Sequence, residues 1–454
     1  MSALTRAALG GADPAPVRIV HLGLGAFHRA HQAWYTARAS DAAGWGIAAF
    51  TGRGPSAARE LAPQDGLYSL VERSDSGDTV SVVTSIVEAH DGADIARLVE
   101  LLAAPSTAVV TITVTEAGYR LTADGTPDVS DGAVAADMAG FASGRAQTTL
   151  GRLLLGLDAR RRADAGPIAV VPCDNMPDNG PVVAAAVGSL AASADPGLAA
   201  WIGENVSFVS TSVDRITPKT TPDDLATVTR LTGWDDAAAV VTEPFSDWVL
   251  SGGFPAGRPD WESAGARFVD EIGPFESRKL WLLNGAHSLL AYTARQRGHE
   301  TVAAAIADPE CLAAVEQFWD AAVRHLRAEG LELPAYRAAL LGRFRNTRIE
   351  HRLAQIAHDG STKLRIRIAP IVLAERAAGR SGAAGIAVLA GWIGQLLPGG
   401  VLADPQDPLA DALRAAAQLP PAEAVPALLA LVDPALAADD SLVAQVREAA
   451  GIAS

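Results

Sequence analysis

The chain has 454 residues, of which 49% are hydrophobic and 20% charged, so a packed core is expected and wholesale disorder is excluded. Its 37 basic and 52 acidic side chains give a formal net charge of −15, which argues against a nucleic-acid partner. No apolar run reaches the roughly 18 residues of a membrane span, and the start of the chain lacks the pattern of a signal peptide. The two cysteines, Cys173 and Cys311, lie far apart and outside any CxxC motif. We therefore expect a cytoplasmic protein with no disulfide, no metal site and no membrane partner.

Short β-type runs alternate with helical stretches over the first half of the chain. The pattern predicts strands at 17–23, 45–50, 80–89, 108–116, 167–175 and 206–216, and helices at about 27–39, 93–102, 144–163 and 180–192. Such alternation is typical of an α/β fold in which helices cover both faces of a doubly wound, mostly parallel sheet. After about residue 268, Ala- and Leu-rich helical patterns dominate, and the 402–440 tail also fits short helices. We therefore expect two domains, 15–268 with the parallel sheet and 269–454 mostly helical.

Two glycines, Gly23 and Gly25, stand between the first predicted strand and the first helix. A tight turn at this point presents backbone N–H groups to a dinucleotide phosphate, so the first domain is predicted to be Rossmann-like and to bind NAD(H). The third glycine of the usual fingerprint is replaced by His28. After the second strand, 50–53 has no acid to hold the ribose hydroxyls, and Arg53 leaves NADP(H) open; it could equally be a loop arginine in an arginine-rich chain.

Lysine is scarce in this chain, because only three of the 37 basic residues are lysines. One of them opens a segment with helical spacing, 279–292. With Lys279 at 0° and about 100° per residue, His287 falls at about 80° and Asn284 at about 140°, on an arc shared with leucines. Polar groups on an apolar face need partners or a ligand. The three could satisfy one another, or they could form a catalytic site.

The catalytic interpretation of these three side chains is specific. Oxidation of a secondary alcohol needs a base for the hydroxyl proton, and a desolvated lysine such as Lys279 can supply it without a metal. An amide such as that of Asn284 can donate to the oxygen as it becomes negative. His287 can orient a substrate hydroxyl.

The sequence resembles the mannitol dehydrogenase family, the polyol-specific long-chain dehydrogenases. The stretches that carry the resemblance run from about residue 18 to about residue 399 and include 21–36, 64–73, 111–119, 172–180, 210–218, 243–249, 279–292 and 359–363. The K-x4-N-x2-H and VDRI-x-P elements are the most specific of them. The resemblance implies a metal-independent oxidoreductase with a nicotinamide cofactor and a site between a Rossmann-type domain and a helical domain.

The resemblance also implies roles for individual residues. Lys279 would be the catalytic base, Asn284 and Asn175 the oxyanion-hole amides, and His287 a substrate-binding imidazole. Asp214 and Arg215 would lie near the substrate. The candidate cofactor contacts are Gly23, Gly25 and Phe27 of the turn after the first strand, together with Arg53 because of its position after the second strand.

The substrate class is suggested by a basic segment, 343–367, which holds seven basic and two acidic residues in an otherwise acidic chain. A sugar-acid carboxylate would bind such a segment, although a solvated basic face is an equal alternative. Lys363 is the main candidate, with Arg365 and Arg367 as others. The sequence is most similar to fructuronate reductases, so we expect D-fructuronate and D-mannonate as the pair; the alternatives are D-mannitol and D-fructose or another polyol. A catalytically silent nucleotide-binding protein is the rival of a different class. The oligomeric state, monomer or homodimer, is left open.

Overall fold

The computed structural model describes residues 2–11, 13–327, 329–402 and 404–452. The chain divides into two compact units, Met1–Gly273 and Pro274–Ser454. The described strands all lie in the first unit, whereas the second is built from helices. None of the helices in the described part combines the length and the apolar character that crossing a bilayer requires.

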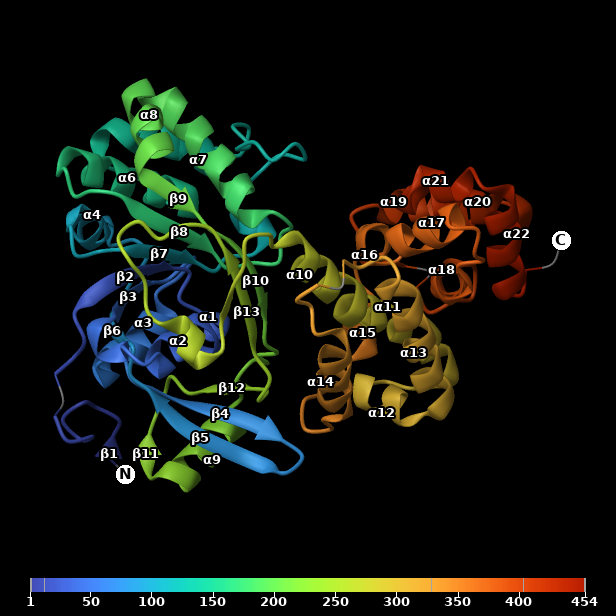
Figure 1. Cartoon of the computed structure of the whole chain (residues 1–454), viewed down its shortest axis with the longest axis horizontal. Helices are drawn as coiled ribbons and strands as arrows, with labels where there is room; N and C mark the ends of the chain where they lie inside the picture. The colour runs from blue at the N-terminus through green and yellow to red at the C-terminus, as the bar shows by residue number, and fades with distance from the viewer. Residues whose placement is uncertain (1, 12, 328, 403, 453–454) are drawn as a thin grey trace. The chain divides into compact units, whose positions relative to one another are not determined.

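A six-stranded sheet in which all neighbouring strands are parallel organises the first unit (Figure 1). Its strands in chain order are β2 (Val17–Leu22), β3 (Gly46–Phe50), β6 (Ile86–His90), β7 (Val109–Ile112), β8 (Ile168–Pro172) and β9 (Val206–Phe208). The order across the sheet is β6-β3-β2-β7-β8-β9, so the chain starts in the middle and winds outwards in both directions. This is the Rossmann arrangement, with its point of reversal between β2 and β7. The predicted α/β doubly wound class is confirmed.

Alternate residues of these strands face two separate apolar cores. On one face Ile19, Ile47 and Val109 pack with α1 (Ala26–Ala30) and α2 (Gln32–Arg38). On the other face the intervening residues pack against α4 (Ile95–Ala103), α6 (Thr149–Arg162), α7 (Asn179–Ala194) and α8 (Pro196–Asn205), which Figure 1 shows together beside the sheet. Burial on both faces explains why these strands read as continuous apolar runs.

The strand predicted at 80–89 is divided in the structure. Its first part is β5 (Gly77–Val83), which pairs antiparallel with β4 (Tyr68–Ser74) in a small sheet, and its second part is β6 of the main sheet. Ser85 lies at the break, where its hydroxyl donates to the carbonyl of Ala33 at 2.7 Å and its own carbonyl accepts from Ile47 N–H at 2.8 Å. These contacts with two other elements divide what looks like one apolar run.

Two further predicted elements are also divided. The run 206–216 forms β9 and then β10 (Ser210–Asp214), which leaves the main sheet and pairs antiparallel with β13 (Asp247–Ser251). The helix predicted at 27–39 is interrupted at His31, whose backbone is not helical and whose ring bonds the carbonyl of Asp247 at 3.1 Å. The remaining elements of this unit are β1 (Ser2–Ala3), α3 (Ser56–Leu61), α5 (Gly132–Gly140), α9 (Pro222–Thr232), β11 (Trp234–Asp235), β12 (Val240–Thr242) and β14 (Arg267–Phe268).

The second unit is organised around α11 (Gly285–Thr293), whose residues 285–292 are all buried. Helix α11 packs against α12, α13, α15, α16 and α18. It is preceded by α10 (Gly273–Arg278) and a π-helical turn, Lys279–Asn284. The other helices are α12 (Val302–Ala307), α13 (Pro309–Val323), α14 (Leu333–Arg345), α15 (Leu353–Ile356), α16 (Gly360–Arg367), α17 (Ala369–Ala377), α18 (Ala383–Leu396), α19 (Ala410–Ala417), α20 (Pro421–Val432), α21 (Pro434–Ala437) and α22 (Asp440–Ala449). Short helices therefore do fill the described part of the 402–440 tail; residue 403 lies outside the described residues.

Candidate active site

A cavity of about 390 Å³ opens at the carboxyl ends of β2, β3 and β7, at the reversal point of the main sheet. It is lined by the turns that follow these strands and by the start of α6: Gly23, Leu24, Gly52, Arg53, Thr113, Val114, Thr115, Ala117, Gly118, Arg120, Gln147, Thr148, Thr149 and Arg152. A doubly wound sheet binds a dinucleotide at this position. Two of the four residues expected to bind the cofactor, Gly23 and Arg53, line the cavity.

Only a glycine fits at position 23. Its φ is +110°, and a Cβ atom there would lie 2.0 Å from the carbonyl oxygen of Thr113. The N–H groups of Gly23 and Leu24 both donate to the carbonyl of Phe50 at 2.9 Å, so the turn is bonded to the end of β3. The absence of a side chain thus lets the β2 turn approach β7 closely and keeps the cavity open, which fits a dinucleotide.

The other two residues of the glycine-rich turn have different surroundings. Gly25 caps the N-terminus of α1, and the ring of Phe27 stacks on His31 with centroids 5.1 Å apart. Neither lines the cavity. His28, at the place of the third glycine, is fully buried and stacks on His21 at 3.3 Å. Burial lowers the pKa of His21 to about 3 and holds that of His28 well below its usual value, so both rings are neutral.

Asn175 follows the end of β8 and is exposed, next to the buried Asp174. Asp174 accepts hydrogen bonds from the Tyr119 hydroxyl at 2.6 Å and from Met176 N–H at 2.9 Å. Asn179 joins β8 to β10, because its amide donates to the carbonyls of Pro172 at 3.3 Å and Thr211 at 3.1 Å and accepts from Thr211 N–H at 2.9 Å. These contacts fix the loop that presents Asn175.

Asp214 and Arg215 lie at the end of β10 and are both buried. The guanidinium of Arg215 pairs with Glu72 at 2.5 Å, donates to the carbonyls of Ala30 at 2.7 Å and Glu243 at 3.1 Å, and lies 4.3 Å from the ring of Trp34. Such contacts join four elements of the first unit. The structure thus gives a structural role to the arginine that was expected near the substrate.

In the second unit, Lys279 and Asn284 are the first and last residues of the π-helical turn, and His287 follows in α11. The spacing of about 100° per residue assumed for this segment therefore does not hold between 279 and 284, because a π turn bonds each residue to the fifth one along. Two side chains from other helices bond its carbonyls: Trp319 Nε1 donates to Leu282 at 2.8 Å, and Arg367 donates to Asn284 at 3.4 Å. Irregular turns of this kind are frequent at functional sites.

His287 is buried, and its Nε2 has no hydrogen-bond partner among the described residues. Its ring lies 4.6 Å from that of His351 and 5.0 Å from that of Phe344. Burial is the main cause that holds the pKa of His287 well below its usual value, followed by electrostatic interaction with His351, Arg343, Arg367 and Lys363. The imidazole is therefore neutral, and a buried polar atom without a protein partner is available to a ligand.

The three basic residues proposed from the 343–367 segment have different environments. Lys363 donates to the carbonyl of Ile356 at 3.2 Å, and burial lowers its pKa. Arg367 donates to Ser288 Oγ at 3.3 Å and to the Asn284 carbonyl at 3.4 Å, so it borders the segment 279–288. Arg365 instead donates to the carbonyls of Val432 and Leu431 at the end of α20, which is a structural role. The ring of His351 packs beside that of His287, a neighbour that the sequence did not indicate, because this contact is made only in the folded unit.

Two other features of the described residues resemble sites. His299, Asp308 and Cys311 bring metal-ligand atoms within 4.8 Å of one another. However, the Asp308 carboxylate already accepts from His299 at 3.0 Å, from Arg297 at 2.9 Å and from Glu310 N–H at 2.9 Å. These bonds account for the cluster as the cap and ion pair at the start of α13.

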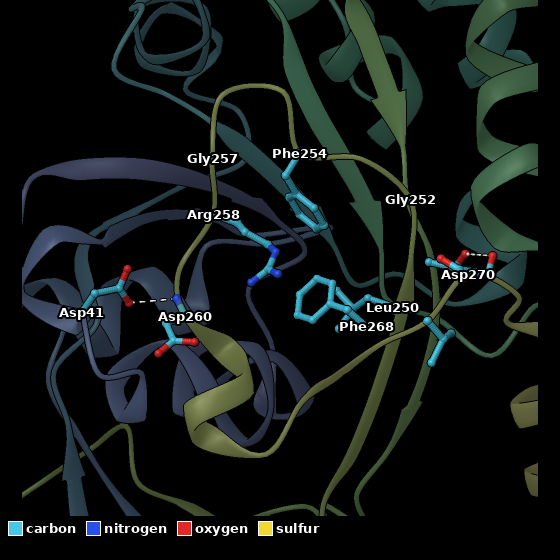
Figure 2. Close-up of a pocket in the computed structure, with 11 residues that line it drawn as sticks. Asp41, Leu250, Gly252, Phe254, Gly257, Arg258, Asp260, Phe268 and Asp270 are labelled. Carbon is cyan, nitrogen blue, oxygen red and sulfur yellow. Dashed lines mark hydrogen bonds between the residues drawn. The ribbon is translucent and has the colours of Figure 1, made fainter. Parts of the chain in front are cut away.

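A larger cavity, of about 890 Å³, lies between the 252–260 loop and β14 (Figure 2). Arg258 lines it, lies 3.4 Å above the ring of Phe268 and pairs with Glu262 at 2.5 Å. The Asp41 carboxylate accepts from Asp260 N–H at 2.9 Å, and the Asp260 carboxylate accepts from the Ser40 hydroxyl at 2.5 Å. These charged groups thus have protein partners, unlike Arg53 in the cavity at the reversal point, which has no such bond among the described residues.

Comparison with known proteins agrees with this geometry. Residues 17–263 match the mannitol dehydrogenase Rossmann domain, and residues 271–451 match the mannitol dehydrogenase C-terminal domain. A D-mannonate oxidoreductase of Escherichia coli is 39% identical over 363 residues, which cover 77% of this chain and 74% of the relative. A mannitol 2-dehydrogenase of Cereibacter sphaeroides is 34% identical over 418 residues, which cover 88% of this chain and 87% of the relative.

The fold is also similar to that of a solved enzyme. The Pseudomonas fluorescens mannitol 2-dehydrogenase in a ternary complex with NAD and D-mannitol superimposes with a TM-score of 0.80 at 32% identity, covering 96% of this chain and 92% of that one. Both domains, the sequence relatives and the fold agree, and the chain therefore belongs to the mannitol dehydrogenase family of oxidoreductases, which act on CH–OH groups.

Proposed function

We propose that this chain interconverts a keto sugar acid and its secondary alcohol, D-fructuronate and D-mannonate, with NAD(H) or NADP(H) as cofactor. The observation that carries the sugar-acid part is the concentration of positive charge around His287. Arg343, Lys363 and Arg367 all act on the pKa of this buried imidazole. A carboxylate is the substrate group that such a cluster would bind.

Lys279 is the proposed general base. In the oxidative direction its neutral amine takes the proton from the hydroxyl on the reacting carbon, and in reduction it returns that proton. The amide of Asn284 makes no hydrogen bond to any described residue, so it is free to donate to the substrate oxygen as that oxygen becomes negative. Asn175 is proposed as the second donor. The nicotinamide, when bound, accepts or supplies the hydride at the same carbon.

The proposed role of His287 follows from its neutrality. Because the surrounding charges and burial keep the ring unprotonated, it orients a substrate hydroxyl through Nε2 rather than through a charge. The charge that neutralises a substrate carboxylate would come from the arginines and the lysine. This scheme needs no metal ion at any step.

The comparisons support two substrate classes. The Escherichia coli relative is named a D-mannonate oxidoreductase, and the Cereibacter relative a mannitol 2-dehydrogenase. The second candidate is therefore D-mannitol and D-fructose, favoured by the likeness to the structure that holds D-mannitol. We further propose that the enzyme works in the cytoplasm, since both cysteines are buried free thiols.

The test is the oxidation of NADH, repeated with NADPH, by the purified protein with fructuronate, tagaturonate and fructose side by side. A kcat/KM for fructuronate well above that for fructose supports the proposal. Preference for fructose would refute the sugar-acid assignment and leave a mannitol 2-dehydrogenase. Absence of turnover with every ketose and both cofactors would contradict the proposed activity as a whole.

A matched pair of variants in α14 tests the carboxylate assignment. Arg343→Met removes one of the charges that act on His287, and Arg345→Met removes an exposed arginine two residues along the same helix. The first should lower kcat/KM for fructuronate by roughly 10- to 100-fold, the range for losing a charged hydrogen bond, and leave fructose within a factor of two. The second should change neither value. Equal losses on both substrates in Arg343→Met would show that Arg343 does not bind a carboxylate.

A further inference from the structure

The cavity at the reversal point of the sheet is lined by arginines and by no acidic residue among those described. In dinucleotide-binding folds, an acid just after the second strand binds the ribose hydroxyls of NAD, whereas an arginine there accommodates the 2′-phosphate of NADP. Here β3 ends at Phe50 and is followed by Thr51, Gly52 and Arg53. None of the described residues that line the cavity is an aspartate or glutamate, but three are arginines.

Arg53 is the first of these arginines. It is exposed, lines the cavity and makes neither a hydrogen bond nor an ion pair with any of the residues that the structure describes. An arginine held on the rim of a phosphate-binding cavity without a carboxylate partner is suited to binding an anion.

Arg152, from α6, is the second arginine that lines the cavity. Its Nη1 donates to the carbonyls of Thr51 and Gly52, both at 3.2 Å, so it supports the loop that carries Arg53. Its Nε is buried and has no partner among the described residues, and no described carboxylate lies within ion-pair distance of it. The guanidinium therefore brings a positive charge without a contacting carboxylate to this end of the cavity.

The turn after the neighbouring strand β6 has no room for a side chain next to Arg152. Gly92 lies just after β6, and a Cβ atom there would be 2.0 Å from the Thr51 carbonyl oxygen and 2.4 Å from Arg152 Nη1. Two acids, Asp91 and Asp137, act on the pKa of Arg152, but neither lines the cavity. Asp91 accepts Ala93 N–H at 3.0 Å, and Asp137 accepts from the Thr148 hydroxyl at 2.5 Å. The third lining arginine, Arg120, is paired with Asp131, so Arg53 and Arg152 remain for a ligand.

We propose that Arg53 and Arg152 form a subsite for the 2′-phosphate of NADP(H), and that this chain binds NADP(H) more tightly than NAD(H). The two guanidinium groups approach the phosphate from different elements, the β3 loop and α6. This inference rests on the proposed use of a nicotinamide dinucleotide, but it does not depend on which sugar is the substrate.

The test measures binding without turnover, by titrating the protein with NADPH and with NADH and following the fluorescence of the reduced nicotinamide. We expect the Kd of NADPH to be lower than that of NADH by about tenfold or more. This is the gain in affinity expected when charged hydrogen bonds form to one additional phosphate. Competition by 2′-AMP should be stronger than competition by 5′-AMP. Tighter binding of NADH, with turnover intact, would overturn this inference and leave the proposed function standing. Absence of binding by both dinucleotides would overturn both.

Two variants test whether Arg53 causes the preference for NADPH. Arg53→Ala should raise the Kd of NADPH by about tenfold or more and leave that of NADH within a factor of two. Arg59→Ala, an exposed arginine of α3 outside the cavity, is the matched control and should change neither value. An unchanged ratio of the two Kd values in Arg53→Ala would overturn the assignment.

Discussion

Replacing Gly23 by alanine should damage both the fold of the first unit and its cofactor site. The φ of +110° costs a residue with a Cβ atom about 1–2 kcal/mol. The new Cβ would also lie 2.0 Å from the Thr113 carbonyl oxygen, where ordinary contacts begin at 3.4 Å, so β2 and β7 must move apart. Such overpacking costs about 1–3 kcal/mol. We therefore expect a total loss of about 2–5 kcal/mol in the free energy of unfolding.

The matched control is Gly52→Ala. Gly52 lines the same cavity, its φ is not positive, and a Cβ atom added there would meet no other described atom within 4 Å. Urea unfolding followed by tryptophan fluorescence should give a clearly lower midpoint for Gly23→Ala than for the control. Titration with NADH should give a Kd raised by about 30-fold or more, since Gly23 and Thr113 both line the cavity. Equal midpoints and equal Kd values for the two variants would refute the reasoning from the close approach of the strands.

Three further predictions concern other parts of the chain. Lys279→Ala should abolish most turnover while leaving the Kd of the cofactor within about twofold, and near-normal turnover would contradict the proposed base. The pKa of His351 is lowered from 6.5 to about 4, mainly by burial and secondly by the charge of Arg343. The unfolded chain therefore binds a proton between pH 6.5 and about 4 that the folded chain does not, so stability falls as the pH falls, by about 1.4 kcal/mol per unit from this group. His351→Phe should flatten the fall in urea midpoint over this range, and an unchanged slope would count against the low pKa. Glu72→Gln should lower the unfolding free energy by about 1–3 kcal/mol, because it leaves the buried charge of Arg215 without its partner, and should leave the KM of the substrate unchanged. A raised KM with unchanged stability would instead favour a substrate role.

The main sheet was predictable because both of its faces are buried. Strands such as β7 and β8 consist almost wholly of apolar residues, and this local signal alone indicates a parallel sheet. The strand β4 was not predicted, because its second half is mixed in polarity and its partners β5 and β12 lie in a separate small sheet. The breaks at Ser85 and His31 depend on hydrogen bonds to distant elements, which no local pattern contains.

The candidate site could be proposed from the sequence to the extent that its residues lie on one segment. Lys279, Asn284 and His287 are close in sequence, but the π turn between the first two depends on packing with α13 and α16, so regular helical spacing misses it. His351 lies on another part of the chain, and nothing near it in the sequence indicates that it packs on His287. The role of Arg215 likewise depends on Glu72, a contact between distant strands.

The π turn has a consequence for how this segment can change. A π turn places one more residue in the helix than the regular α pattern, so losing any one residue of 280–283 would restore α-helical bonding. The residues before and after the turn would keep nearly their present facing, because the bond that now joins residues five apart would join the same two residues four apart. The turn itself would change, since its carbonyls at Leu282 and Asn284 accept from Trp319 and Arg367. The additional residue thus determines how the turn packs against α13 and α16, while the direction of α11 is compatible with either form of the helix.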